Sequence, residues 1–213
     1  MGTWLPIFII FASGLCSAAG ADEYFRSTRV DKTVPAHCSE PALRQFSLKQ
    51  KTVIYGIDGS SARGFTHEIA ISRDDAAYLW ATFLSNKQYD SRTMLEVRHR
   101  RLEAPFKALA DAQREMGFSF EKEGDVLEAL AITDLAREYP APRYFITGGI
   151  EYSDGASNTI GELDILVGER EGCRIIAIGE SKLGPKQLSH ARKQLQRFLD
   201  FLRTKCAGSS QCG

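Results

Sequence analysis

The chain lacks an excess of charge of either sign. Its 213 residues contain 27 lysines and arginines and 27 aspartates and glutamates, so the formal net charge at pH 7 is zero. The global positive field typical of many nucleic-acid-binding proteins is therefore absent. Any contact with nucleic acid has to come from a local cluster of basic residues.

Several common catalytic patterns are missing as well. There is no CxxC motif and the four histidines are scattered, so a structural zinc site is not expected. No serine or cysteine has an obvious histidine partner, which argues against nucleophilic catalysis. The glycine- and serine-rich loop over 58–64 lacks the glycine-lysine ending of a P-loop. We interpret it as a plain hairpin loop between strands over 52–57 and 68–72.

Long apolar runs are absent except near the start of the chain. Residues 4–16 are uncharged and too few to span a membrane comfortably, and small residues ending in Ala19-Gly20-Ala21 follow them. This pattern predicts a secretory signal peptide over residues 1–21, although no lysine or arginine precedes the run. An uncleaved anchor and a misplaced start codon are the alternatives. We therefore expect a secreted or periplasmic protein with no stable membrane insertion after cleavage.

Four cysteines follow the expected cleavage site: Cys38, Cys173, Cys206 and Cys212. An even number in an exported chain favours disulfides. Cys206 and Cys212 could close a small loop, which would leave Cys38 to pair with Cys173. Four cysteines allow three pairings, and the sequence does not choose between them.

The periodic patterns predict a mixture of helices and strands. Besides the two early strands, we expect a strand over 143–152 and helices over 72–85, 93–116, 123–138 and from 184 to about 202. The first half of the second helix carries a basic run that begins at Arg98. We interpret this run as a solvated helix face. A phosphate-contacting surface beside an active site is the alternative.

The stretch Gly161–Lys182 combines two expected strands with charges at their ends. Alternating apolar residues predict a strand over 163–167, and a second run over 174–178 leads into Glu180-Ser181-Lys182. Side chains two apart on a strand share a face, so Glu180 and Lys182 point the same way. If the turn places Asp164 opposite Ile178 or Glu180, these charges converge on one side of the sheet.

Polar side chains from two helices can reach the same region. Glu128 projects within about 60° of Ala131 and Ile132, so an acid lies on or beside a core-facing stripe. In the last helix, Gln187 and Gln194 line one margin of the apolar stripe. Carboxylates that face a common point suit a hard cation such as Mg²⁺ or Mn²⁺, and a neighbouring lysine can stabilise developing negative charge. These ingredients fit phosphodiester hydrolysis.

Asp164 followed by Glu180-Ser181-Lys182 resembles the D…(D/E)-x-K signature of the PD-(D/E)XK nuclease superfamily. Gly161-Glu162-Leu163-Asp164, with the same three residues after it, is similar to the GE(I/L)D…EVK form of Holliday-junction-resolvase-like members. Gly124 and Glu128 resemble the part of the family's first helix that carries its glutamate. The resemblance covers about residues 120–203.

The resemblance implies a restriction-endonuclease-like core, which is an α/β (α+β) fold with a central mixed sheet flanked by helices. We place this core at 117–205, after an N-terminal α/β extension over 22–116 and before a tail over 206–213. The family core usually continues with another strand after the last helix. In this chain that strand is either missing or supplied from residues 51–72.

The resemblance also implies roles for individual residues. Asp164 and Glu180 would bind Mg²⁺ or Mn²⁺, and Glu128 would assist the metal directly or through water. Lys182 would be the catalytic lysine. Gln194 matches, more loosely, a glutamine that some members carry on the helix after the lysine. Gln187 competes for that assignment, and Glu162 is less often a direct ligand.

The function implied is that of an exported, metal-dependent nuclease that acts on nucleic acid, with DNA favoured over RNA. A homodimer is an open alternative to a monomer, because many relatives act as dimers. Three other functions remain open. They are a non-catalytic exported binding or interaction domain, a nuclease-like fold that binds nucleic acid without cutting it, and a metal-dependent hydrolase of another phosphoester.

Overall fold

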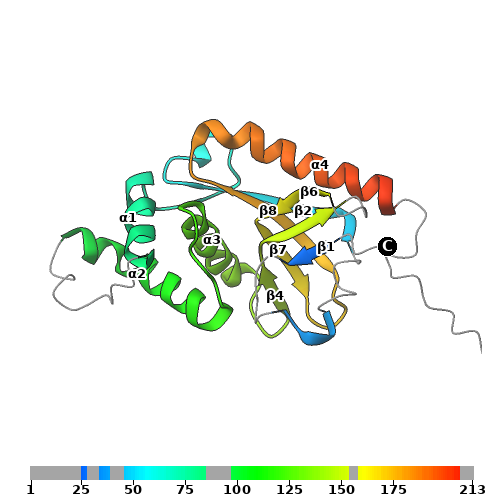
Figure 1. The fold of residues 1–213 in the computed structure, drawn as a ribbon, viewed down its shortest axis with the longest axis horizontal. Coiled ribbons are helices and arrows are strands. Elements are labelled where there is room, and N and C mark those ends of the chain that lie inside the picture. Colours follow the sequence, from blue (N-terminus) through cyan, green and yellow to red (C-terminus); the bar gives the residue numbers. More distant parts are fainter. Residues whose placement is uncertain (1–24, 28–33, 39–45, 85–96, 154–157, 207–213) are drawn as a thin grey trace, which may run out of the picture.

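The computed structural model describes residues 25–27, 34–38, 46–84, 97–153 and 158–206, and it contains two sheets. The central sheet is mixed, with the strand order β3-β2-β8-β7-β4 (Figure 1). Its strands are β2 (Phe46–Ile57), β3 (His67–Ile69), β4 (Tyr144–Thr147), β7 (Ile165–Glu169) and β8 (Ile175–Lys182). The smaller antiparallel sheet has the order β1-β5-β6 and consists of β1 (Phe25–Ser27), β5 (Ile150–Ser153) and β6 (Thr159–Leu163). The expected α+β class with a central mixed sheet is confirmed.

Helices cover both faces of the central sheet (Figure 1). They are α1 (Arg73–Leu84), α2 (Val97–Asp111), α3 (Gly124–Glu138) and α4 (Leu188–Cys206). The α3 face holds one apolar core, in which Val53 and Val167 pack with residues of α1, α2 and α3. The α4 face holds a second core, in which Leu166 and Ile178 pack with the apolar stripe of α4. The alternation along the strands therefore sends successive side chains into different cores.

The strand β2 lies between β3 and β8 and runs parallel to both. The hairpin loop that we expected at 58–64 is therefore wrong, because a hairpin joins antiparallel strands. The chain instead turns through the short 3-10 helix Ser61–Arg63 and returns so that β3 pairs in parallel with the end of β2. The segment before residue 117 thus supplies two strands to the same sheet as β7 and β8.

The glycine pair Gly148–Gly149 divides the strand that we expected over 143–152 into two strands. Gly149 has φ of 62°, a left-handed conformation that glycine adopts easily. β4 ends before the pair and joins the central sheet, whereas β5 begins after it and joins the smaller sheet.

The helix predictions agree with the structure within a few residues where residues are described. Ser72 caps α1, since its hydroxyl accepts a hydrogen bond from the Asp75 backbone N–H at 3.1 Å. The expected second helix ends in a π-helical turn, Ala112–Met116, before Gly117 with φ of 72°. In the last helix, the 3-10 turn Pro185–Gln187 precedes α4. A proline is tolerated in such a first turn.

A disulfide joins Cys38 to Cys173 in the core beneath α4. This is one of the pairings that the sequence left open, and disulfides of this kind persist in oxidising compartments. The side chain of Cys206, all of Cys212 and the signal peptide expected over 1–21 lie outside the described residues. Within the described ranges, no helix has the length and apolar character needed to cross a membrane.

Candidate active site

The strand register brings Asp164 and Glu180 together. β7 and β8 are antiparallel, with Ile165 opposite Gly179 and Leu166 opposite Ile178. Continued by one residue, this register places Asp164 opposite Glu180, which is one of the two alignments that we expected. Asp164 is the single residue between β6 and β7, where the chain passes from the smaller sheet to the central sheet.

Lys182 joins the two carboxylates into one ion cluster. Its Nζ donates to Asp164 Oδ2 at 2.9 Å and to Glu180 Oε2 at 2.6 Å. The backbone N–H of Ser181 also donates to Asp164 Oδ2, at 2.9 Å. The three charged side chains are thus held on the face of the sheet that α4 covers. Asp164, Glu180 and Lys182 form the group that we call the ion cluster.

The ion cluster is largely removed from solvent. The side chain of Glu180 is fully buried, and those of Lys182 and Asp164 are only 14% and 15% exposed. Burial, together with the charge of Asp164, raises the pKa of Glu180 to about 8, although Lys182 acts in the opposite direction. Burial lowers the pKa of Lys182, but the two carboxylates outweigh it and raise that pKa above its usual value.

Glu128 of α3 lies close to the backbone of Asp164. Its residue is only 3% exposed, as the sequence predicted for an acid on the core-facing stripe. A Cβ added at Gly148 would collide with Glu128 Oε1 and with the carbonyl oxygen of Asp164. Backbone and side-chain oxygens therefore approach Gly148 closely, because only a residue without a side chain leaves room for both.

The remaining candidates, Gln194, Gln187 and Glu162, differ in burial and position. Gln194 of α4 is half-buried, and its Oε1 is buried with no hydrogen-bond partner among the described residues. Gln187 is exposed in the turn before α4. Glu162 lies in β6 opposite Glu151 in the smaller sheet, so it does not share a strand with Asp164. Of the two glutamines, Gln194 is the one that has a buried polar atom.

Tyr152 is a neighbour of the cluster that the sequence reasoning missed. Its ring is buried between Phe198 and Phe201 of α4, at centroid distances of 5.0 and 5.1 Å. Burial raises the pKa of Tyr152 to about 12, with opposite contributions from Arg197 and Glu180. The signal that could have found it is Gly161, where a Cβ would meet the Tyr152 ring.

The basic run in α2 lies away from the ion cluster. α2 packs with α3 in the core on the opposite face of the sheet from α4. Arg101 forms an ion pair with Asp75 at 2.6 Å, and Arg114 pairs with Asp111 at 2.6 Å. The side chains of Arg98 and His99 lie outside the described residues. Arg101 and Arg114 therefore act in local ion pairs.

Two observations test whether this site fits a hard divalent cation. Glu180 Oε1 is a buried carboxylate oxygen without a hydrogen-bond partner in the described part of the chain, and such an atom is costly unless something binds it. The Lys182 ammonium already lies between two carboxylates, so the site accommodates positive charge. Oxygen ligands without soft neighbours are also the type that Mg²⁺ and Mn²⁺ take. The residues fit the ion.

The position of Glu128 limits how it could contribute. One group of possible metal ligands lies close together in the described ranges. It consists of His37, Cys38 and Cys173, whose ligand atoms all lie within 4.8 Å of one another. The sulfurs of that group are committed to the disulfide. Glu128 therefore does not complete a compact triad with Asp164 and Glu180 in this arrangement. A contribution through water suits its position better than direct ligation.

Comparison of the chain with protein-family models, with curated proteins and with solved structures found no match.

Proposed function

We propose that this protein is a metal-dependent nuclease that hydrolyses phosphodiester bonds of nucleic acid, with DNA favoured over RNA. The observation that carries the proposal is the buried carboxylate oxygen of Glu180, which lacks a partner although it lies beside Asp164 and Lys182. A fully buried acid with an unpartnered oxygen destabilises a fold, so its presence favours a functional role.

The sheet supports the restriction-endonuclease-like core in the proposal. That core calls for one more strand than the segment 117–205 provides, and β2 lies beside β8 on the side opposite β7. β2 falls largely within residues 51–72, which were one of the two alternatives for this strand. α3 with Glu128 and α4 with Gln194 lie on opposite faces, as flanking helices of the core should.

The chain's own residues would divide the chemistry as follows. Asp164 and Glu180 would hold Mg²⁺ or Mn²⁺, and Glu128 would support the ion through water. When bound, such an ion polarises a phosphoryl oxygen and lowers the pKa of a water molecule. Ser181 fixes Asp164 through its backbone N–H. The Lys182 ammonium would stabilise negative charge that develops on the phosphate.

Export is part of the same proposal. The disulfide between Cys38 and Cys173 is compatible with an oxidising compartment, and the signal peptide expected over 1–21 would deliver the chain there. A secreted or periplasmic nuclease would meet foreign or environmental nucleic acid. Finding the native protein in the cytosol with residues 1–21 intact would contradict this part.

A cleavage assay tests the function. Plasmid, linear duplex, single-stranded DNA and RNA are each incubated with the oxidatively folded protein in Mg²⁺, Mn²⁺ or EDTA. We expect cutting in the presence of metal and a loss of at least about a hundredfold in Asp164→Asn and Lys182→Met. Glu171→Gln, an exposed acid in the β7–β8 turn, is the matched control and should cut normally.

Circular dichroism confirms that each variant is folded, and a thermal melt with and without Mn²⁺ reports metal binding independently of cleavage. Failure of the folded protein to cut any substrate would overturn the nuclease proposal. Binding without cutting would favour the nuclease-like binding protein instead. Hydrolysis of a small phosphoester alone would favour the other metal-dependent hydrolase.

A further inference from the structure

The exposed side of α4 carries basic residues at helical spacing. His190, Lys193 and Arg197 stand at i, i+3 and i+7, which places them on one stripe of the helix, and all three are exposed. Lys186, in the 3-10 turn directly before α4, is exposed as well. We call Lys186, His190, Lys193 and Arg197 the α4 stripe.

The α4 stripe lies on the helix that covers the face of the sheet with the ion cluster. Gln194, whose buried Oε1 lacks a partner, lies four residues after His190 and three before Arg197, so it borders the stripe. Arg197 donates to the carbonyl oxygen of Ile160 in β6 at 3.4 Å, which places its guanidinium on the side of α4 that faces the smaller sheet. The stripe also begins only four residues after Lys182 in the chain.

The positive charge of the stripe is not neutralised locally. Within the described residues, neither Lys186 nor Lys193 has an ion-pair or hydrogen-bond partner. Asp200 is the only acid in α4, and it is engaged by Arg203 at 2.6 Å and by Gln196 at 2.9 Å. Lys51, by contrast, is paired with Glu138 at 2.8 Å. In a chain of zero net charge, the stripe is therefore a local positive surface.

We propose that the α4 stripe binds the phosphate backbone of a nucleic-acid strand and leads that strand toward the ion cluster. The identity of the ligand rests on the proposed nuclease function, but the stripe itself rests on the exposure and spacing of its residues. From His190 to Arg197 the helix advances about 10 Å, which matches roughly three phosphates of one duplex strand. Contacts to phosphates carry no sequence information, so binding should be insensitive to sequence.

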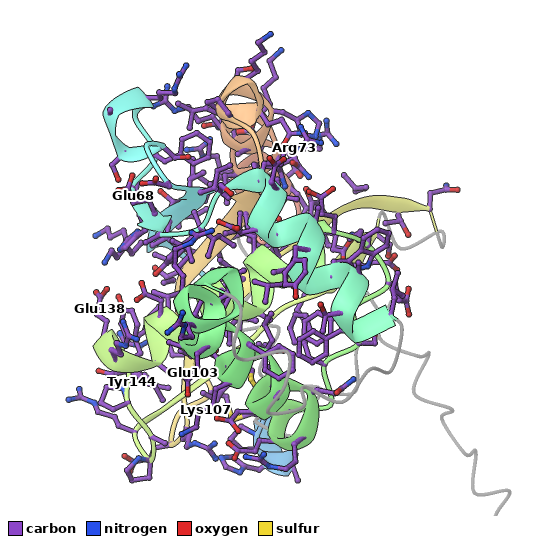
Figure 2. All side chains as sticks on the ribbon, turned by 90° about the vertical axis from the view of Figure 1, so that its left-hand side faces the viewer. Glu68, Arg73, Glu103, Lys107, Glu138 and Tyr144 are labelled. Atoms are coloured by element: carbon purple, nitrogen blue, oxygen red, sulfur yellow. A yellow bond between two sulfur atoms is a disulfide. The ribbon has the colours of Figure 1, made fainter. Side chains whose placement is uncertain are left out.

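Fluorescence anisotropy in EDTA tests this inference, because binding is then measured without cleavage. The full chain is titrated into a fluorescein-labelled duplex and a labelled single strand at salt concentrations from about 50 to 200 mM. The test variant is Lys186→Gln/Lys193→Gln. The control is Lys49→Gln/Lys107→Gln, which removes the same charge at exposed sites; Lys107 projects from α2, away from α4 (Figure 2).

We expect the test variant to lose affinity by about tenfold or more near 0.1 M salt. The slope of log affinity against log salt should decrease in magnitude by about 1.4 to 1.8, because each lost phosphate contact removes about 0.7 to 0.9. The control should stay within about twofold of the wild type, since its lysines would not contact the ligand. Thermal melts verify that both variants remain folded.

Three results would overturn the inference. The wild-type chain could fail to bind either oligonucleotide, the two variants could lose affinity equally, or phosphatidylserine vesicles could bind the stripe in preference to nucleic acid. The cleavage assay separates this inference from the function. If the wild type and Lys186→Gln/Lys193→Gln cut equally well, only the inference about the stripe is overturned. If binding depends on the stripe but no substrate is cut, only the nuclease proposal is overturned.

Discussion

At the scale of single residues, the ion cluster contains one positive and two negative side chains in a nearly dry environment. Lys182 can neutralise one carboxylate, so the second is in excess whenever both are ionised. Burial is the main cause of the raised pKa of Glu180, and the charge of Asp164 adds to it. The two carboxylates outweigh burial at Lys182 and raise its pKa too. A divalent cation would more than offset this single excess negative charge.

Neutralising Glu180 and removing the charge of Lys182 should therefore have opposite effects on stability. At a pH above the raised pKa of Glu180, Glu180→Gln removes the excess negative charge and should leave the free energy of unfolding unchanged or raise it by about 1–2 kcal/mol. Lys182→Met leaves two buried carboxylates without a cation and should lower it by about 3 kcal/mol. Urea unfolding in EDTA measures both.

Thermal melts in Mn²⁺ are a second test of the charge imbalance in the ion cluster. It should raise the melting temperature of Lys182→Met more than that of the wild type, because the ion takes over the role of the missing ammonium. The charge imbalance would be contradicted if Glu180→Gln and Lys182→Met lowered the free energy of unfolding equally and Mn²⁺ raised the melting temperatures of Lys182→Met and the wild type by the same amount.

Gly148 is a second residue whose identity the site requires. Gly148→Ala should lower stability by about 1–3 kcal/mol, because its Cβ meets the backbone of Asp164 as well as Glu128. It should also lower cleavage by about a hundredfold, since displaced carboxylates lose their alignment. Gly172→Ala is the matched control, because a Cβ there meets no atom within 4 Å. Similar behaviour of the two alanine variants in urea unfolding and cleavage would count against the close approach.

At the scale of elements, α1 shows how a helix start is fixed by reciprocal hydrogen bonds. The Asp75 carboxylate accepts from the Ser72 backbone N–H at 3.1 Å and from the Ser72 hydroxyl at 2.7 Å. Ser72 accepts in turn from the Asp75 backbone N–H, as in a capping box. Arg101 of α2 donates to the same carboxylate at 2.6 Å, so the cap also ties α1 to α2.

This cap should make stability depend on pH. Burial alone would raise the pKa of Asp75, but the hydrogen bonds from Arg101 and Ser72 outweigh it and lower that pKa to about 2. The stabilisation is fully present above the unfolded-state pKa, near 4, and is lost as the pH falls toward about 2. Asp75→Asn should therefore cost about 1–2 kcal/mol at pH 7 and little at pH 2.

Urea unfolding at the two pH values measures this difference. Asp74→Asn is the control, because its side chain is exposed in the same helical turn. A loss in Asp75→Asn that is the same at both pH values would show that the ionised carboxylate is not the stabilising form.

At the scale of the whole molecule, the disulfide links the start of the described chain to the turn before β8. Cys38 and Cys173 are separated by 135 positions, and both are buried in the core under α4. The same core contains Phe46 of β2, whose ring contacts that of Phe198 at 5.0 Å. The bond therefore ties the N-terminal segment to the sheet that carries the ion cluster.

Removing this bond should destabilise the whole fold. Cys38→Ser/Cys173→Ser should lower the free energy of unfolding by about 2–5 kcal/mol, because a cross-link over so long a loop restricts the unfolded chain. Thermal melts measure the effect. Dithiothreitol should produce a similar loss in Cys206→Ser/Cys212→Ser, where Cys38–Cys173 remains. An unchanged melt under both conditions would show that the bond contributes no stability.

Local patterns in the sequence were sufficient to predict much of the candidate site. Period-2 alternation predicted the strands β7 and β8, and Asp164 opposite Glu180 is one of the two alignments that it left open. The helical period predicted that Glu128 lies on or beside the core-facing stripe, where it is buried. Both follow from side-chain direction within one element or one turn. The helix expected over 72–85 likewise begins within one residue of α1, which Ser72 caps.

Other features depended on contacts between distant parts of the chain. Local patterns do not encode that β2 runs parallel to β8 or that β4 and β5 belong to different sheets. The partner of Cys38 was also open, because spacing alone cannot distinguish the three pairings. Tyr152 was missed for the same reason, since its ring contacts with Phe198 and Phe201 join segments that are far apart in the chain.

The sequence by itself therefore determined which residues carry charge and which way each side chain points within its own strand or helix. The tertiary structure decided which strands became neighbours, and with that it decided how deeply Glu180 is buried and that Lys182 bridges both acids. The physical reason is that alternation and helical period depend on backbone geometry over a few residues. Burial and ion pairing depend on the packing of segments that are far apart in the chain.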